Sequence, residues 1–555
     1  MRRGLFLLGL VSAATAEAVV PFPVAELPVS REILVRFHQD QPGLVEGELA
    51  RRLDAALGYR GFTEIRRVRT DRPLAVVRVE RASNFAPALR AIREMPEVRY
   101  AEPQAFYRIQ TVGGLPNDKG LPLLWGLQNT GQKDPGRQVG KPGSDVRVTR
   151  LWERGLVGSR EVKVAVIDTG IDHDHPDLAA NLYRNPGEIP GNGKDDDGNG
   201  YVDDVHGWNA IKNSGASDDD HGHGSHCAGT IGAVGDNQIG VVGVNWRVAL
   251  VPVKFLNSSG YGSTEDAIES VYYARKLGVH IMSNSWGGDT YSKALEEEIA
   301  AARDAGILFV VAAGNEADNI DETPRYPASY SLTNVVTVAA TDNRDQLASF
   351  SNRGARSVHV AAPGLYVLST TNQKTYANMS GTSMATPHVA GVAALLWAAR
   401  PEWTFAEIKD RLIRASDPVP QLRREVAARG RVNAEHALDG VFPDRTDPAE
   451  GDWKRELEVF ESPHPYKIYK NYSFVVRRAG ARKIRVHFER IETRNPRDVV
   501  TLETPEGDAY QSWSGEHAVV TSDYLDGDTV VVRLKSPSGD SPGYGFKIDR
   551  VDFIP

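Results

Sequence analysis

The chain of 555 residues is long enough for more than one domain, and 41% hydrophobic and 25% charged residues are typical of a soluble globular protein. The net charge is −8, with +4 in residues 1–109 and therefore −12 in residues 110–555. No dense Lys/Arg stripe follows residue 110, so we expect no nucleic-acid partner. The single cysteine excludes an intrachain disulfide.

The N-terminus has the pattern of an export signal. Arg2 and Arg3 precede an apolar run over residues 5–11, and small residues follow as far as Ala18. The run is too short to span a bilayer, and no later stretch reaches about 18 apolar residues. We therefore expect a signal peptide over residues 1–18, a secreted protein (extracellular or periplasmic) and no membrane span.

Residues 19–112 form the next predicted domain, a compact α+β unit. Alternation and helical spacing predict three strands and two helices: Glu32–Phe37, Leu44–Leu57 (helix), Ala75–Val79, Phe85–Met95 (helix) and Val98–Pro103. A Gly/Pro-containing segment over residues 106–116 follows the last strand, and a protease could cut there.

Residues 113–440 alternate apolar strands with helices, which indicates an α/β domain with a mostly parallel sheet covered on both faces. The predicted strands are Val162–Ile167, Val248–Phe255, Ile281–Ser283, Leu308–Ala312, Val335–Ala340 and Val358–Ala361. The predicted helices are Thr264–Leu277, Lys293–Ala305, Pro387–Arg400 and Ala406–Ala415.

A polar linker over residues 441–452 leads to a C-terminal segment, residues 453–555, without a strong helical pattern. Its alternating stretches are separated by turn residues, which predicts an all-β sandwich. The predicted strands are Tyr472–Val476, Lys483–Phe488, Val499–Glu503, Thr529–Leu534 and Tyr544–Ile548.

Three motifs in the α/β domain suit one mechanism. Asp168, in Asp-Thr-Gly, follows a buried strand, and His223 lies in the Gly-rich stretch His221-Gly-His-Gly-Ser-His226. Ser383 ends a Gly-Thr-Ser turn that runs into a helix, where unpaired N–H groups favour negative charge. A serine nucleophile needs a base, and the base needs a carboxylate.

Each motif also has another interpretation when it is taken alone. Asp-Thr-Gly occurs in aspartic proteases, which need a second such carboxylate. His221, His223 and His226 could form a zinc cluster, although the Gly-rich spacing matches no usual ligand pattern. The Gly-Thr-Ser turn could be a simple helix cap.

Together and in this order, the motifs of Asp168, His223 and Ser383 resemble those of the subtilisin-like serine proteases (subtilases). A cysteine beside the histidine motif, here Cys227, is a feature in which the chain resembles the proteinase K branch of this family. The resemblance covers residues 1–440 and implies a three-layer subtilisin-like fold, serine endopeptidase activity on proteins and peptides, and a monomer. It implies that Ser383 is the nucleophile, His223 the general base and acid, Asp168 its orienting carboxylate, and Asn315 the oxyanion donor.

The resemblance also implies that an extended substrate pairs with two exposed backbone edges. The residues implied are Ser285, Trp286, Gly287 and Gly288 on one edge, Ser258, Ser259 and Gly260 on the other, and Ala312 and Gly314 in the wall of the pocket before the cut. The residues of these walls carry no charge, which favours substrates with an apolar or aromatic side chain in the pocket. The nearby acids Glu316, Asp318, Asp321 and Glu322 leave Arg or Lys as an alternative.

Structural Ca²⁺ is the expected cofactor. Asp195, Asp197 and Asn199 alternate before Gly200 as in an EF-hand loop, but His206 replaces the closing Glu, so Asp203 or Asp204 would have to substitute. A solvated acidic turn is the alternative. The resemblance implies a second site formed by Asp177, Val234, Asn237, Ile239 and Val241, with Asp236 as the alternative to Asn237.

Residues 19–112 resemble a subtilase propeptide, which acts as folding template and intramolecular inhibitor and is released by self-cleavage between about residues 110 and 115. The C-terminal sandwich distantly resembles CUB-like domains, and its role is open: binding a substrate, a surface or calcium, or stabilising the core. Cys227 is expected to be a buried small hydrophobe, although a thiol beside the histidine would make the enzyme sensitive to mercurials. An inactive subtilase fold serving as a binding module is the rival hypothesis.

Overall fold

The structure is a computed structural model that describes residues 17–19, 32–38, 62–68, 74–79, 85–103, 114–537 and 542–555. Most of the predicted signal peptide and the whole predicted helix over residues 44–57 lie outside these ranges. The chain divides into two compact units, residues 24–111 and the rest. Every helix among the described residues is too short or too polar to cross a membrane.

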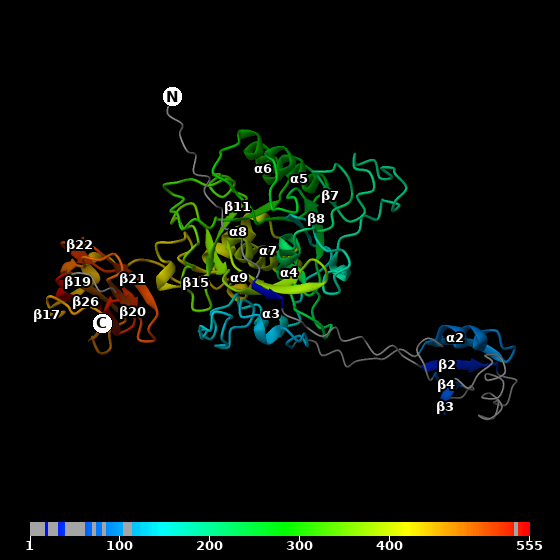
Figure 1. The fold of residues 1–555 in the computed structure, drawn as a ribbon, viewed down its shortest axis with the longest axis horizontal. Coiled ribbons are helices and arrows are strands. Elements are labelled where there is room, and N and C mark those ends of the chain that lie inside the picture. Colours follow the sequence, from blue (N-terminus) through cyan, green and yellow to red (C-terminus); the bar gives the residue numbers. More distant parts are fainter. Residues whose placement is uncertain are drawn as a thin grey trace. The chain divides into compact units, whose positions relative to one another are not determined.

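The smaller unit is an antiparallel sheet covered by a helix (Figure 1). Its strand order is β3-β4-β2-β5, the order of a ferredoxin-like unit. Ala88 and Ile92 on the helix are fully buried in a core with Ile33, Val35 and Val77 on the sheet. Its elements are β2 (Glu32–Phe37), β3 (Phe62–Val68), β4 (Leu74–Val79), α2 (Phe85–Arg93) and β5 (Val98–Pro103). The sequence did not predict β3.

The α/β domain is built on a nine-stranded, mostly parallel sheet, as predicted. Only its last pair, β15 and β16, is antiparallel. The inner strands are apolar and buried along nearly their whole length because helices cover both faces. The strands in spatial order are β15 (Asp417–Pro418), β16 (Gly430–Arg431), β12 (Val360–Pro363), β11 (Val335–Thr341), β10 (Leu308–Ala312), β9 (Ile281–Asn284), β6 (Lys163–Asp168), β8 (Ala249–Lys254) and β7 (Trp208–Asn209).

Helices α5 and α6 pack together against β6, β8 and β10, and α4 and α7 pack together against β6 and β9–β12 (Figure 1). The latter two helices are rich in small residues, and α7 also packs closely on the segment after α4, where a Cβ on Gly391 would meet Val244 at 2.8 Å. The helices are α3 (Thr149–Trp152), α4 (His223–Gly232), α5 (Thr264–Lys276), α6 (Lys293–Asp304), α7 (Thr382–Ala399), α8 (Phe405–Arg414) and α9 (Ala434–Asp439). Short 3-10 turns are η2 (Leu121–Leu123), η3 (Ala179–Asn181), η4 (Pro420–Leu422) and η5 (Glu450–Asp452). A small sheet joins β1 (Glu17–Val19), β14 (Thr375–Met379) and β13 (Val367–Thr371).

Helix α7 begins at Thr382, five residues before the predicted start at Pro387. Pro387 lacks the N–H that would bond to the carbonyl oxygen of Ser383 four residues earlier. That oxygen instead accepts a hydrogen bond from the hydroxyl of Ser285 at 2.9 Å. The helix therefore tolerates a proline in its second turn.

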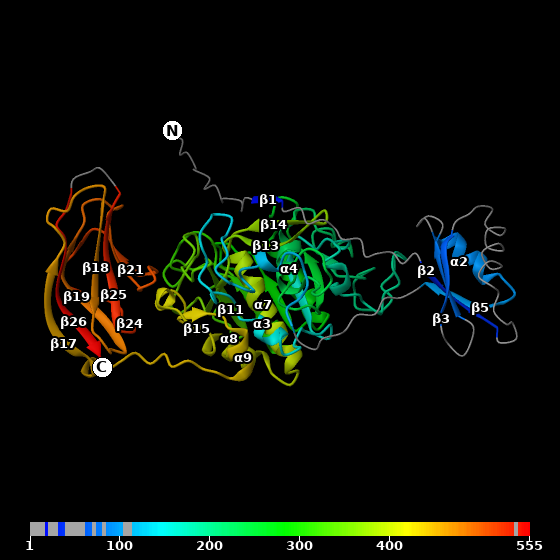
Figure 2. The same ribbon diagram turned by 90° about the horizontal axis from the view of Figure 1, so that it is seen from below.

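The C-terminal residues form two antiparallel sheets around a separate apolar core, as predicted (Figure 2). Phe488 and Phe546 are fully buried between the sheets and stack edge to face. One sheet contains β17 (Lys454–Glu461), β26 (Gly545–Ile554), β19 (Lys483–Glu492), β22 (Glu516–His517), β23 (Val520–Thr521) and β24 (Leu525–Asp526). The other contains β18 (Lys470–Arg477), β25 (Thr529–Ser536), β20 (Val499–Glu503) and β21 (Ala509–Trp513).

Candidate active site and cation sites

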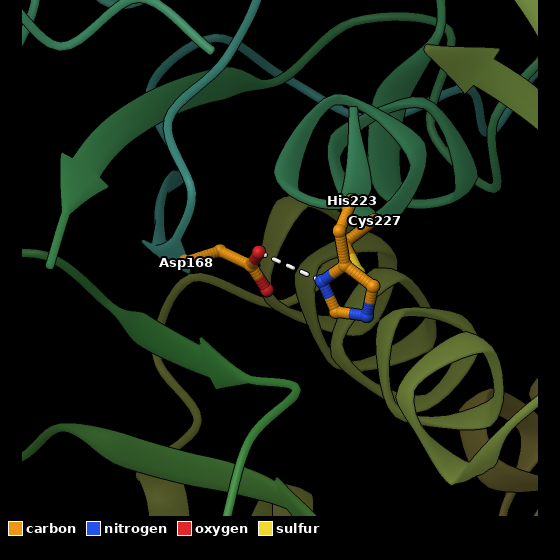
Figure 3. A group of neighbouring side chains, drawn as sticks. All are labelled: Asp168, His223 and Cys227. Carbon is orange, nitrogen blue, oxygen red and sulfur yellow. Dashed lines mark hydrogen bonds and ion pairs between the residues drawn. The ribbon is translucent and has the colours of Figure 1, made fainter. Parts of the chain in front are cut away.

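Asp168 and His223 form a hydrogen-bonded pair (Figure 3). Asp168 is the last residue of β6 and is fully buried, and one of its carboxylate oxygens lies 2.8 Å from Nδ1 of His223. The same oxygen accepts the N–H of Thr169 at 2.8 Å. Nδ1 is therefore the protonated nitrogen of a neutral ring, and Nε2 is left as the base.

Glycines bring the first turn of α4 onto the end of β6. Gly222 precedes the helix with φ +105°, a conformation that L side chains rarely adopt. Gly224 lies so near the Asp-Thr-Gly turn that an added Cβ would be 2.1 Å from the carbonyl oxygen of Gly170. His223, between these two glycines, is thereby placed against Asp168.

The environment of His223 raises its pKa. Burial opposes the charged imidazolium, but the Asp168 carboxylate outweighs burial and holds the pKa of His223 above its usual 6.5. The pair thus stabilises the cation that forms when the imidazole accepts a proton.

Cys227 lies one turn after His223 on α4 (Figure 3). Asp168, His223 and Cys227 each offer one atom within 4.8 Å of the others. The thiol is 1% exposed and contacts the carbonyl oxygen of Ser383 at 3.5 Å, and burial raises the pKa of Cys227 well above its usual value. It is the buried small hydrophobe expected from the sequence.

The alternative of a zinc cluster is not supported by the described residues. Nε2 of His226 bonds to the carbonyl oxygens of Val367 and Ala377 at 2.9 and 3.1 Å, so this histidine anchors the β13–β14 hairpin to α4. His221 is exposed, and Nδ1 of His223 bonds to Asp168. The three rings therefore do not share a ligand position.

Ser383 occupies the first turn of α7, where backbone N–H groups have no intrahelical partner. Its hydroxyl donates to the carbonyl oxygen of Ser285 at 3.0 Å, and the Ser285 hydroxyl donates back to the Ser383 carbonyl. Within the described chain no hydrogen bond links Ser383 to His223. Catalytic hydrogen bonds commonly tighten only when substrate is bound.

Asn315 lies beyond the end of β10 and contacts the start of α7. Its side-chain oxygen accepts hydrogen bonds from the N–H and the hydroxyl of Thr382, at 2.9 and 3.0 Å. The amide orientation follows from these two bonds, because only the oxygen can accept them. Nδ2 of Asn315 is left as a donor beside the N–H of Ser383.

The expected substrate edges lie next to these groups. The Ser285 carbonyl contacts the Ser383 hydroxyl, and Gly288 pairs with Tyr326 through two backbone hydrogen bonds of 2.8 Å. Ser258, Ser259 and Gly260 form an exposed turn; a Cβ on Gly260 would lie 3.7 Å from Nε2 of His221. Gly314 donates its N–H to the Thr382 hydroxyl. Trp286 packs edge to face against Phe255, with the ring centroids 4.8 Å apart.

The four acids near the expected pocket all have local partners. Asp318 pairs with Arg325 at 2.7 Å, and Glu316 accepts from Nδ2 of Asn352 at 2.7 Å. Asp321 accepts the N–H of Ser357 at 2.8 Å, and Glu322 accepts from Asn319 at 2.8 Å. Asp318 and Glu322 thus have partners in their own loop, whereas Glu316 and Asp321 contact the segment over residues 352–357.

Asp177, which the resemblance places at a calcium site, is fully buried. Its carboxylate accepts from Nδ2 of Asn237 at 2.7 Å and from the N–H of Val241 at 2.9 Å, so the loop over residues 234–241 wraps around it. The sequence analysis missed Asp118, which is 3% exposed and has one oxygen without a hydrogen-bond partner. Burial, together with the Asp177 carboxylate, raises the pKa of Asp118 to about 7. Two buried carboxylates, of which Asp118 has a free oxygen, fit a hard cation.

The acidic loop over residues 195–204 does not converge as an EF-hand does. Asp195 accepts the N–H groups of Asn199 and Gly200, and Asp203 accepts those of Asn192 and Gly193, so both aspartates shape turns. Asp197 and Asp204 come together instead with Glu188, a residue from the preceding loop that the motif search missed. Asn199 donates its amide to both of these aspartates. Of the residues expected from the EF-hand pattern, Asp197 and Asp204 lie in this cluster of the described residues, whereas Asp195 and Asp203 lie outside it.

A buried Asp–His pair beside a serine at a helix N-terminus is the site of a serine hydrolase. A family model described as the Subtilase family matches residues 159–442, and the chain belongs to that family. It is 36% identical to thermitase of Thermoactinomyces vulgaris, over 53% of this chain and 93% of that protein. It is 39% identical to M-protease of Shouchella clausii, over 53% of this chain and 68% of the relative.

A third relative is subtilisin-like protease 1 of Plasmodium vivax, which is 36% identical over 52% of this chain. The match spans 48% of that protein, so the chain covers about half the length of this relative.

Proposed function

We propose that this chain is a secreted serine endopeptidase that hydrolyses peptide bonds through an acyl-enzyme on Ser383. The observation that carries the proposal is the 2.8 Å hydrogen bond between Asp168 and Nδ1 of His223 beside a serine at the N-terminus of α7. This pair leaves Nε2 of His223 free to act as a base.

In the proposed mechanism the Ser383 hydroxyl leaves the Ser285 carbonyl and gives its proton to Nε2 of His223 as Oγ attacks the scissile carbonyl carbon. Nδ2 of Asn315 and the N–H of Ser383 donate to the oxyanion. His223 then protonates the leaving amine, and water attacks the acyl-enzyme by the same route in reverse. Asp168 stabilises the imidazolium in both steps.

The substrate is proposed to be an extended peptide that adds to the backbone of Ser285–Gly288 on one side and residues 258–260 on the other. We propose that the enzyme prefers substrates with an apolar or aromatic side chain on the residue immediately before the scissile bond. The support is that Glu316 and Asp318 already have Asn352 and Arg325 as partners. A cationic side chain would have to displace these contacts.

Residues 19–112 are proposed to be a propeptide that inhibits the enzyme and is removed by self-cleavage between about residues 110 and 115. The opposite net charges of residues 1–109 and 110–555 favour their association. Secretion through a signal peptide over residues 1–18 and a monomeric state complete the proposal. Structural Ca²⁺ is proposed at Asp118, Asp177 and the loop over residues 234–241.

The test combines labelling by a fluorophosphonate with intact-mass measurement on the chain expressed without residues 1–18. We expect the wild type to be labelled and to lose residues up to about 112, and Ser383→Ala to remain full length and unlabelled. Ser380→Ala is the matched control, since its hydroxyl only accepts the N–H of Tyr366. If the wild type stays full length and unlabelled, the binding-module hypothesis replaces the protease.

A further inference from the structure

A buried lysine lies at the end of β8, next to the turn that carries Asp168. Lys254 is the last residue of β8 and pairs in register with Asp168, the last residue of β6. Its side chain is 3% exposed. Because taking an ammonium group out of water costs free energy, lysine is rarely buried unless its charge and its donors are satisfied. The contacts of this ammonium group therefore indicate its role.

All three N–H donors of the Lys254 ammonium group have an acceptor. Nζ donates to the carbonyl oxygen of Thr169 at 2.6 Å, to the carbonyl oxygen of Leu256 at 2.8 Å and to Oδ1 of Asp220 at 2.7 Å. Lysine has three donors and no acceptor, so its hydrogen-bonding capacity is filled. One of the three acceptors also carries the opposite charge.

The three acceptors belong to three segments around the catalytic pair. Thr169 follows Asp168, and Asp220 lies three residues before His223. Leu256 lies just beyond β8 and donates its own N–H to the carbonyl oxygen of Asp168 at 3.2 Å. One ammonium group therefore connects the turn after β6, the loop after β8 and the segment that leads into α4.

Net stability is a weak reason for a charge in this place. A buried ion pair often contributes little to stability, and an apolar side chain of similar size can replace it at little cost. Three directed hydrogen bonds supply a fixed geometry instead, because Nζ keeps all of them only while Thr169, Leu256 and Asp220 stay in place. The Asp220 side chain is 49% exposed, so water can solvate its carboxylate when the lysine is absent.

A second connection between the same segments runs through the start of α4. The Thr169 hydroxyl donates to Asp219 at 2.8 Å and accepts the N–H of Gly224 at 2.8 Å. These contacts involve the first turn of the helix, whereas Lys254 binds the backbone of Thr169 and the segment before the helix. The lysine therefore adds a connection that the helix start does not provide.

We propose that Lys254 is a positioning residue for the catalytic pair, whose ammonium group holds the Asp168 turn and the segment before His223 together by binding Thr169 and Asp220. It does not touch the substrate or the reacting atoms, and it acts through the hydrogen bond between Asp168 and His223. The inference rests on the proposed function, in which this pair activates the nucleophile.

The first measurement is steady-state kinetics on one peptide with the chain expressed without residues 1–18. Lys254→Met removes all three hydrogen bonds and should lower kcat about 100-fold with little change in KM, since a misplacement near 1 Å costs that much. Asp220→Ala removes only the bond to the segment before His223 and should lower kcat about 10-fold. Asp220→Asn keeps an oxygen in the same place, so it should recover most of that loss. Asp218→Ala removes the neighbouring carboxylate, which contacts His173, and is the matched control that should leave kcat unchanged.

The second measurement needs no proteolysis. In the chain carrying Ser383→Ala, the proton on Nδ1 of His223, which bonds to Asp168 at 2.8 Å, should give a downfield resonance in proton NMR that is absent from His223→Ala. We expect Lys254→Met and Asp220→Ala to move or broaden this resonance. A chain that hydrolyses no peptide would contradict the proposed function, and the resonance would still test the role of Lys254.

Two results would overturn the inference. One is an unchanged resonance together with an unchanged kcat in Lys254→Met and Asp220→Ala. The other is an equal loss in Asp220→Asn and Asp220→Ala, because the charge of Asp220 rather than the place of its oxygen would then matter. If Lys254→Met does not fold, the two Asp220 variants decide the question, since this side chain is half-exposed.

Discussion

The side-chain oxygen of Asn315 accepts two hydrogen bonds from Thr382, the residue before Ser383. Because both bonds end on the oxygen, the NH₂ group makes no bond to Thr382 and is left to donate elsewhere. The end of β10 and the start of α7 are thus joined through one amide. This joint orients the proposed oxyanion donor before any substrate arrives, which is the condition for electrostatic stabilisation of a transition state.

The first prediction concerns this joint. We expect Asn315→Ala to lower kcat about 100- to 1,000-fold with little change in KM, the loss known for this kind of donor from subtilisin itself. Thr382→Val keeps the backbone bond and removes the hydroxyl bond, so kcat should fall less, by about 10-fold or under. Steady-state kinetics on one peptide measures both. A Thr382→Val enzyme as impaired as Asn315→Ala would show that Thr382 acts in another way.

The second prediction is a pH profile. His223 must be neutral to accept a proton, so kcat/KM should fall as pH decreases through its pKa, which Asp168 holds above 6.5. In Asp168→Asn the main carboxylate that raises the pKa of His223 is absent, and burial is opposed only by the more weakly acting Asp219, so the acid limb should move to lower pH. We also expect kcat to drop about 10⁴-fold because the ring loses its correct tautomer. An unmoved acid limb would contradict the assignment of His223 as the base.

The order of strands and helices could be predicted from the sequence because buried parallel strands are nearly uninterrupted apolar runs. The bounds of β10 were predicted to the residue, and β6 to within one residue at each end. The predicted start of helix α7 was too late because the sequence near Pro387 does not show what replaces the missing backbone hydrogen bond. The replacement donor is the hydroxyl of Ser285, which lies 98 residues before Ser383. The motifs around Asp168, His223 and Ser383 could be recognised because each is a short run of residues with fixed spacing.

The buried acidic clusters contain residues that could not be predicted from the sequence. Asp177 carries a recognisable neighbourhood, but Asp118 lies 59 residues earlier and Glu188 is separated from Asp197 by a loop. Neither has a spacing that marks it as a ligand. Their common signal, a buried carboxylate oxygen without a hydrogen bond, exists only in three dimensions.

The third prediction concerns stability in acid. Burial lowers the pKa of His226 and His359 to about 3 and that of His388 to about 4, so all three are neutral when folded. The unfolded chain protonates them below pH 6.5 and therefore binds up to three more protons between about pH 6.5 and 4. The free energy of unfolding should then fall by up to about 4 kcal/mol per pH unit in that range.

Urea unfolding of the Ser383→Ala chain at a series of pH values checks this slope. His359 accepts the N–H of Thr337 through Nδ1, so His359→Asn keeps a side chain that can accept this bond and should remove about one third of the slope. His517, which is only partly buried, gives the matched control: His517→Asn should leave the slope unchanged. A flat profile between pH 6.5 and 4 would contradict the neutral state of the buried rings.

The fourth prediction tests how α4 reaches β6. In Gly224→Ala the new Cβ would lie 2.1 Å from the carbonyl oxygen of Gly170 and 3.2 Å from the Cβ of Asp168. Neither contact can relax by moving a flexible side chain, so the helix start must shift away from Asp168, at a cost of about 1–3 kcal/mol in stability. A displacement near 1 Å between His223 and Asp168 should lower kcat about 100-fold. Gly451→Ala, where a Cβ meets nothing within 4 Å, is the matched control and should change neither quantity. If Gly224→Ala keeps full activity, the position of His223 does not depend on this close approach.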